Sequence, residues 1–219
     1  MSITDTTGLH LDNFQIVSTT APAADSKGTA TGTYFNGVTL GAAGAVPGDS
    51  NTAASFDGVD DYVSVARQVQ DDLSPELRFR STQGIGVGTS WSQGAGLVDG
   101  NVAAVANDFG VSLRSDGKVV GGIGNPDTSI VSTTSGFNDG AWHHVVFTRV
   151  KASGALKLYV DGSLEGSATA VNAASLTAQA TINLGRLANG ASYFAGSLDE
   201  VATYNVALSA AAVLAHAGG

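Results

Sequence analysis

The chain has 219 residues, of which 43% are hydrophobic and 29 are glycines, and it contains no cysteine. Its size and turn-rich composition suit one large β-domain, and the lack of cysteine excludes disulfides and thiolate metal sites. The formal net charge of −9 argues against nucleic acid and anionic membrane surfaces as partners, because both would be repelled.

Residues 1–20 are expected to be a leader or the remnant of a preceding module, and the domain itself is expected to cover residues 21–219. The opening MSITDTTGLH lacks the basic residues and apolar run of a signal peptide. No segment reaches the roughly 18 consecutive apolar residues of a membrane span, so membrane insertion is not expected. As an isolated module the domain is expected to be a monomer.

Short alternating runs bounded by Gly, Asp and Asn predict strands and hairpins along most of the chain. In ELRFR, for example, Leu77 and Phe79 share one face. The runs that flank Asp116-Gly117 and Asp161-Gly162 predict hairpins, because Asp-Gly favours tight turns between strands. Only LSAAAVLAHA near the C-terminus has a helical pattern, and Ser209 is its expected N-cap.

Two adjacent histidines, His143 and His144, follow Trp142 in the run AWHHVVFTRV. Both faces of this run are largely apolar, which predicts a central strand that is covered on both sides. Neighbouring residues on a strand point in opposite directions, so the two histidines cannot share one metal ion. One buried, hydrogen-bonded histidine and one at a sheet face are expected instead of a zinc site.

Four segments resemble, in their order and spacing, the laminin G-like, concanavalin A-like jelly-roll family of bacterial extracellular proteins. They are AASFDGVDDYVSV, DGAWHHVVFTR, LKLYVDGSLEGS and YFAGSLDEVATYNVALS. The resemblance covers about residues 21–217. It implies an all-β antiparallel sandwich with one short C-terminal helix, located outside the cell or on the bacterial surface. Relatives of this shape include carbohydrate-binding modules, adhesion modules, glycan-cleaving enzymes and spacers.

The glutamates argue against catalysis within this chain. Retaining glycosidases need two carboxylates about 5.5 Å apart, which an E-x-D-x-E run on one strand would supply. Glu76, Glu165 and Glu200 are scattered and belong to no such run. The chain is therefore not expected to be an enzyme.

A first candidate calcium site combines FDGVDD with SLDEV. Asp residues in loops suit calcium, and the chain has 16 Asp against 3 Glu. The change of apolar parity between Leu198 and Val201 predicts a bulge, which would re-aim the side chains there. The resemblance implies a structural calcium held by an acidic residue of the last strand, which assigns Asp199 and, with it, Asp57 and Asp60. Alternatively, Asp57 only bonds its own turn and Asp199 caps the bulge.

A second candidate site lies in GLVDGNVAAVANDFG and GNPDTS. If the hairpin at Asp116-Gly117 forms, the loops at its other end share one rim. Six side chains would then converge to hold calcium or to bond sugar hydroxyls: Asp99, Asp108 and Asp127 as metal ligands, and Asn101, Asn107 and Asn125 as ligand-binding groups. The alternative is a set of turns in which Asn and Asp cap strand ends.

Sugar binding by β-sandwiches usually uses an exposed aromatic ring, because the C–H face of a sugar stacks on it. Trp91 in the glycine-rich GIGVGTSWSQGAG is the expected platform, with Tyr193 and Tyr62 as further candidates. Arg149 and Arg186 are expected to add polar contacts. Alternatively, Trp91 folds onto hydrophobic surface and the arginines pair with nearby acids.

Together these observations predict a non-catalytic, calcium-stabilised recognition or adhesion module of an extracellular bacterial protein, with a glycan or cell-surface polysaccharide as partner. Two alternatives stay open: a structural spacer without ligand in a large surface protein, and an accessory module of a glycan-degrading enzyme.

Overall fold

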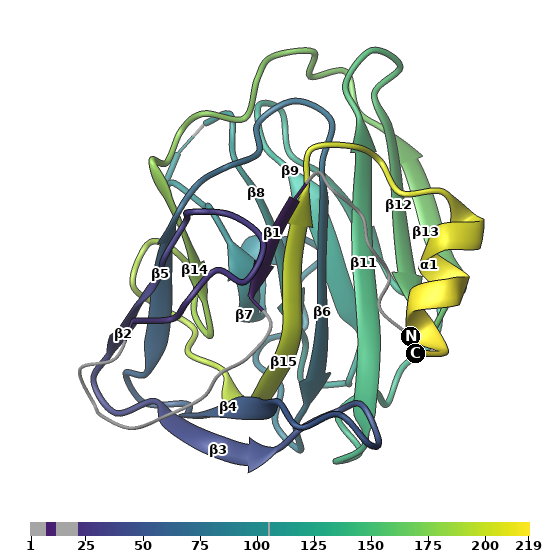
Figure 1. The fold of residues 1–219 in the computed structure, drawn as a ribbon. Coiled ribbons are helices and arrows are strands. Elements are labelled where there is room, and N and C mark those ends of the chain that lie inside the picture. The colour runs from purple at the N-terminus through teal and green to yellow at the C-terminus, as the bar shows by residue number, and fades with distance from the viewer. Residues whose placement is uncertain (1–7, 12–21, 105) are drawn as a thin grey trace.

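The computed structural model describes residues 8–11, 22–104 and 106–219. They form a sandwich of two antiparallel β-sheets, with one helix at the C-terminal end (Figure 1). The predicted fold class is thereby confirmed.

The eight-stranded sheet, called sheet I, is built around a ten-residue strand, β15 (Ala195–Tyr204), which pairs with three other strands. Across the sheet the order is β13 (Ser163–Thr169), β12 (Ala155–Val160), β11 (Trp142–Val150), β6 (Ser74–Arg80), β15, β4 (Thr52–Asp57) and β3 (Thr39–Ala43). Strand β1 (Gly8–Leu11) lies off this path and also pairs with β15.

The second sheet, called sheet II, has seven strands. Their order is β10 (Thr128–Val131), β9 (Val119–Ile123), β8 (Phe109–Leu113), β7 (Ala95–Asp99), β14 (Thr181–Leu184), β5 (Tyr62–Ala66) and β2 (Thr33–Phe35). A 3-10 turn, η1 (Trp91–Gln93), precedes β7 and is capped by Ser90.

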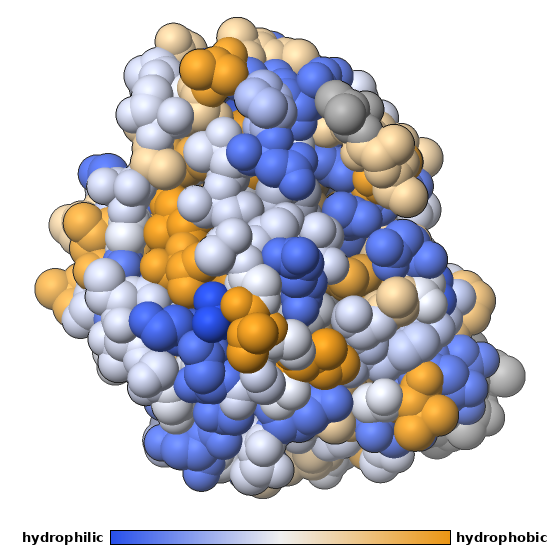
Figure 2. All heavy atoms as spheres, turned by 180° about the vertical axis from the view of Figure 1, so that it is seen from behind, coloured by the Kyte–Doolittle hydropathy of each residue, from blue (hydrophilic) through white to orange (hydrophobic). Residues whose placement is uncertain are grey.

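The main core lies between the two sheets. On β8, Phe109, Val111 and Leu113 point into it, whereas Gly110 and Ser112 lie on the outer side of sheet II. Leu77 and Phe79 on β6 enter the same core from sheet I, as their shared face predicts. Each such buried side chain contributes about 2 kcal/mol to folding. Seen from behind, the surface shows hydrophobic residues only as separate patches among hydrophilic ones (Figure 2).

Both predicted hairpins form. Asp161 and Gly162 join β12 to β13 with φ of 50° and 76°, the two left-handed residues of the tightest hairpin turn. Asp116 and Gly117 turn the chain between β8 and β9, and Gly117 has a φ of 73°.

The C-terminal helix α1 (Ala210–Ala217) covers the outer face of sheet I. Ser209 accepts the amide of Ala212, as expected of its N-cap. Val213 of the helix packs with Val146, Tyr159 and Tyr204 in a second, smaller core. Strand β11 is therefore covered on both sides, which confirms its prediction as a central strand.

The two adjacent histidines lie on opposite faces of β11. His144 is buried, and its Nε2 lies 2.5 Å from Oε1 of Glu76. His143 lies between two carboxylates, with Nδ1 2.8 Å from Asp161 Oδ2 and Nε2 3.2 Å from Asp139 Oδ1. The side-chain bonds of both histidines thus go to carboxylates, as the alternation along the strand predicts.

Part of the expected leader belongs to the sandwich. Residues 8–11 form β1, with Leu11 opposite Val201 of β15. This pairing arises because a short extended segment can add to a free stretch of strand. Residues 1–7 and 12–20 lie outside the described residues.

Candidate functional site

A cavity of about 610 Å³ lies at the end of sheet II where β7 ends and β8 begins. Four separate stretches of chain contribute to it, and all of them are connections between strands. The lining residues are Ser92, Asn101, Val102, Ala103, Ala104, Asp108, Asn125, Pro126, Asp127 and Asn189.

The β8–β9 hairpin brings two of these stretches together. Because the turn lies at the far end of the hairpin, the start of β8 and the end of β9 are neighbours, and the amide of Gly124 donates to the carbonyl of Asp108 (3.0 Å). Of the six residues predicted to share this rim, four line the cavity: Asn101, Asp108, Asn125 and Asp127.

The other two predicted residues lie behind the lining and hold it. Asn107 Oδ1 accepts the side-chain amide of Asn125 at 2.9 Å. Asp99 Oδ1 accepts the backbone amides of Asn101 and Ala188, both at 2.8 Å. Asp99 therefore fixes two of the loops that border the cavity.

Sequence reasoning missed Ser92 and Asn189 as lining residues. Asn189-Gly190 is a turn signal in the sequence, but its position beside the cavity depends on the fold. The amide of Leu187 donates to the carbonyl of Ala191, which folds this loop back on itself at the rim.

The side chain of Asn101 distinguishes this cavity from an ordinary surface hollow. Asn101 is only 7% exposed and lines the cavity, yet its side-chain amide has no hydrogen-bond partner among the described residues. The free amide therefore leaves donors and an acceptor available to a molecule in the cavity.

Burial perturbs the acids of this region. Asp99 is fully buried, which raises its pKa to about 8. Burial also raises the pKa of Asp108 to about 6, and the nearby charge of Asp127 adds to the effect. Oδ2 of Asp108 accepts the amide of Val102 at 2.7 Å and thereby shapes the adjoining loop.

Trp91 is not an exposed platform, which corrects the prediction. It is 1% exposed, and its ring lies on the outer face of sheet II against Gly110 and Gly122. A Cβ at Gly122 would lie 2.5 Å from Cε3 of the indole, so only glycine leaves room for the ring. The apolar surface of the indole is removed from water in this place.

The other two aromatic candidates, both half-buried, lie around Arg186 instead. Cζ of Arg186 lies 3.3 Å from the ring centroid of Tyr62, and Nη1 lies 3.3 Å from the hydroxyl of Tyr193. Phe35 stacks on Tyr62 with ring centroids 4.4 Å apart. Arg186 and Asn189 belong to the same β14–β15 connection, which joins this aromatic group to the cavity.

Arg149 is not among the residues that line the cavity, which is a second correction. It is fully buried, and its guanidinium donates to the backbone carbonyls of Asp71, Asn172 and Ala174 at 2.8–3.0 Å. These bonds tie two loops to the end of β11, so the residue has a structural role.

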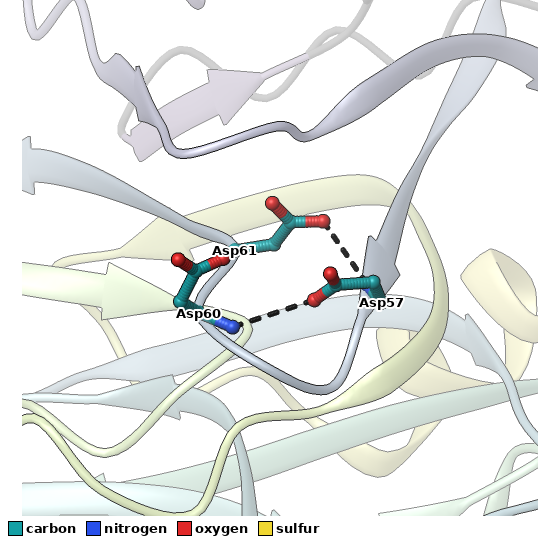
Figure 3. Close-up of side chains that lie close together, drawn as sticks. All are labelled: Asp57, Asp60 and Asp61. Carbon is teal, nitrogen blue, oxygen red and sulfur yellow. Dashed lines mark hydrogen bonds between the residues drawn. The ribbon is translucent and has the colours of Figure 1, made fainter.

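The first predicted calcium cluster divides into two places. Asp57, Asp60 and Asp61 lie together at the β4–β5 turn, with carboxylate oxygens within 4.8 Å of one another (Figure 3). Asp57 Oδ1 accepts the amide of Val59, and Asp61 Oδ2 accepts the amide of Asp57. The carboxylates thus bond their own turn. Asp199 does not join them.

Asp199 lies beside the β3–β4 connection. On the neighbouring strand β4, Asp57 lies opposite Ala195 of β15. Ala195 is four residues from Asp199, or roughly 13 Å along the strand. The predicted bulge is confirmed by a register shift after Asp199 and by a φ of 49° at Glu200. Oδ2 of Asp199 accepts the amide of Ala45 at 2.6 Å.

Three oxygens surround one point next to Gly44. A Cβ there would lie 2.9 Å from the carbonyl oxygen of Asn51, 3.1 Å from Asp199 Oδ2 and 3.4 Å from Asn51 Oδ1. Oδ1 of Asn51 is buried and has no hydrogen-bond partner among the residues described. The Asn51 amide nitrogen donates to Oε1 of Glu200 at 2.5 Å. Oxygens of this kind, one of them buried and unpaired, are the ligands that a hard cation such as calcium takes, and we call this group the oxygen cradle.

A laminin G family model, described as the Concanavalin A-like lectin/glucanases superfamily, matches residues 57–214. The chain belongs to this superfamily. The match begins at Asp57 and includes every residue that lines the cavity. No curated protein sequence matches the chain.

Solved structures show the same superfamily fold at low sequence identity. Domain 4 of AbnA, a GH43 extracellular arabinanase from Geobacillus stearothermophilus solved with arabinotriose, is 18% identical with a TM-score of 0.72. The match covers 96% of this chain and 99% of that one.

Two toxin domains are also similar. The binding domain of botulinum neurotoxin DC, solved with SialylT, is 14% identical with a TM-score of 0.71 and matches over 99% of this chain. The binding domain of Paraclostridial Mosquitocidal Protein 1 is 14% identical with a TM-score of 0.68 over 95%. This superfamily member spans 52% of the length of each.

None of the described helices combines the length and the apolar character that a membrane span requires.

Proposed function

We propose that this protein is a non-catalytic glycan-recognition module of an extracellular bacterial protein, and that it binds sugar in the cavity at the end of sheet II. The observation that carries the proposal is the side-chain amide of Asn101, which has no hydrogen-bond partner among the described residues and faces a cavity lined by further amide and carboxylate side chains. Sugar hydroxyls both donate and accept hydrogen bonds, so they suit such a lining. A cavity of about 610 Å³ also has the size of ordinary small-ligand sites.

Similar structures support this choice of ligand. The AbnA domain was solved with arabinotriose, and the neurotoxin DC domain was solved with SialylT. Because the AbnA domain belongs to an extracellular arabinanase and matches the present chain over nearly its full length, the role of accessory module in a glycan-degrading enzyme is the favoured variant of the proposal.

The engagement of the three glutamates supports the absence of catalysis. Glu76 bonds His144 under the helix, Glu165 accepts bonds from Thr133, and Glu200 accepts the amide of Asn51. Each of these carboxylates holds a structural contact. None of them lines the cavity, whose carboxylates are those of Asp108 and Asp127.

We propose in addition that calcium binds at the oxygen cradle of Asp199 and Asn51. Glu200 and the carbonyl of Asn51 complete the available oxygen ligands. The ion would neutralise the buried Asp199 carboxylate, whose pKa burial raises, and it would fasten the β3–β4 connection to β15.

The glycan proposal is tested by binding measurements on matched asparagine variants. Asn101→Ala and Asn125→Ala each remove an amide from the cavity, whereas Asn205→Ala removes an exposed amide near the helix. We expect the first two to weaken binding of the best ligand from a glycan array at least about tenfold, and the third to leave it unchanged.

The folding of each variant is checked by its melting midpoint. A glycan array that gives no binding at any sugar would favour a spacer without ligand. Binding that survives both cavity substitutions would place the glycan elsewhere on the protein.

A further inference from the structure

The cavity offers negative charge and no positive charge to a ligand. Its described lining contains two carboxylates, Asp108 and Asp127, together with amides, one hydroxyl and small apolar side chains. No lysine, arginine or histidine is among the lining residues. Asp127 is exposed, and no hydrogen bond to another described residue occupies its carboxylate.

Basic residues from the strands and loops around the cavity are engaged elsewhere. Arg114 is paired with Asp116 at 2.8 Å, and Nζ of Lys118 donates to the carbonyl of Ser132 at 2.8 Å. Arg149 is enclosed by backbone carbonyls. None of these cations faces the cavity.

Two further arginines adjoin the lining through neighbouring residues. Nε of Arg67 donates to the carbonyl of Gln179, whose own side chain donates to the carbonyl of Asn101. Arg186 shares a loop with Asn189, but its guanidinium lies over the Tyr62 ring. Both guanidinium groups are therefore held in contacts outside the cavity.

The free hydrogen-bonding atoms of the lining include several acceptors beside the amide donors of Asn101. Asn125 uses its side-chain nitrogen to bond Asn107, which leaves its oxygen for a ligand. The carboxylate oxygens of Asp127 also only accept when ionised. A ligand that bonds these acceptors must carry hydrogen-bond donors. An unsubstituted sugar hydroxyl supplies a donor, whereas an ionised carboxylate, sulfate or phosphate group does not.

We infer that the cavity selects neutral glycans with free hydroxyls and discriminates against sugars that carry a carboxylate or a sulfate. This inference rests on the proposed glycan-binding function and narrows its substrate class. A negative ligand group beside Asp127 would meet repulsion that no cation of the lining offsets. The net charge of −9 acts in the same direction at longer range.

The test uses pairs of probes that differ only in the charge of the acid group. An oligogalacturonate and its methyl ester of equal length form one pair, and sialyl-N-acetyllactosamine and its methyl ester form the second. Calorimetric titration at pH 7.5 with 1 mM calcium is expected to show the acidic member of a bound pair at least about tenfold weaker. Raising the salt concentration should narrow the difference, because salt screens charge.

The variant Asp127→Asn isolates the cause. It keeps the shape of the side chain and removes its charge, so the acidic probe should gain affinity relative to the neutral one, with an unchanged melting midpoint. Equal or tighter binding of the acidic probe by the unaltered protein would overturn the inference while leaving glycan binding intact. Failure of all four probes, and of every neutral glycan on an array, would overturn the proposed function and this inference with it.

Discussion

Asp99 is an acid enclosed in the domain without a basic partner. Its Oδ1 accepts two backbone amides, whereas Oδ2 has no hydrogen-bond partner within the described residues. Burial raises its pKa to about 8, above the usual value near 3.8. A carboxyl with a raised folded-state pKa lowers stability as pH rises from the unfolded pKa to the folded one, here from about 4 to about 8.

Asp99→Asn is therefore expected to change how stability depends on pH. The amide keeps an acceptor for the two backbone bonds and cannot ionise. We expect the variant and the parent to melt at similar temperatures near pH 4, and the variant to melt higher by about 10 °C at pH 8. Thermal denaturation across this pH range gives the measurement. A difference that stays constant with pH would contradict the assignment.

Residue types alone located part of the site. The Asn and Asp residues between strands predicted a shared rim because a hairpin brings its two open ends together, and Asp108 and Asn125 meet there. The position of Trp91 could not be predicted in this way. Its burial depends on Gly110 of β8 and Gly122 of β9, which have no side chains. The ring fits against both glycines only once the sheet has folded.

At the scale of elements, helix α1 is fastened to sheet I by polar as well as apolar contacts. Glu76 lies between two imidazoles, 2.5 Å from His144 Nε2 and 3.0 Å from His216 Nδ1 of the helix. Nη2 of Arg78 donates to the carbonyls of His216 and Ala217 at the C-terminal end of the helix. Bonds from the two histidines hold the pKa of Glu76 at about 2 against the opposing effect of burial.

Glu76→Gln is expected to loosen the helix. A carboxyl with a lowered pKa contributes stability above its unfolded pKa of about 4.5, and loses it as pH falls toward the folded value of about 2. We expect the variant to lose about 3 kcal/mol at pH 7 and to differ little from the parent near pH 2.

Chemical denaturation at several pH values measures this loss, and hydrogen exchange of residues 210–217 locates it. Unchanged exchange of the helix amides, with stability lost elsewhere, would show that Glu76 does not fasten the helix.

Strands and hairpins followed from alternation and from Asp-Gly turns, since these are local properties of the sequence. The bulge at Asp199 also followed, because the apolar parity changes there. Two pairings were not predictable. Strand β1 joins β15, and Asp199 meets Ala45 rather than Asp57, because both contacts depend on how distant segments lie across sheet I.

At the scale of the whole molecule, the proposed calcium ion would connect parts of sheet I that are far apart in the sequence. A ligand that binds only the folded state raises its stability, by about 2.7 kcal/mol when its concentration is a hundredfold above Kd. We expect calcium to raise the melting midpoint of the parent protein and of Asp57→Asn, and to have no effect on Asp199→Asn. Differential scanning fluorimetry with calcium or with chelator provides the comparison.

The two variants discriminate between the acid turn of Figure 3 and the cradle beside Gly44. Loss of the calcium effect in Asp57→Asn alone would move the ion to the acid turn. The absence of any calcium effect on the parent protein would remove the ion from both places.

The cavity is made of connections, and the strands beneath it supply only their ends. Substitution or lengthening of such segments is tolerated far better than changes within packed strands. Selection, natural or in the laboratory, can therefore change which ligand the cavity would accept by exchanging a few rim positions, while the strands go on folding as before. The same separation makes the domain a suitable frame for grafting new recognition loops.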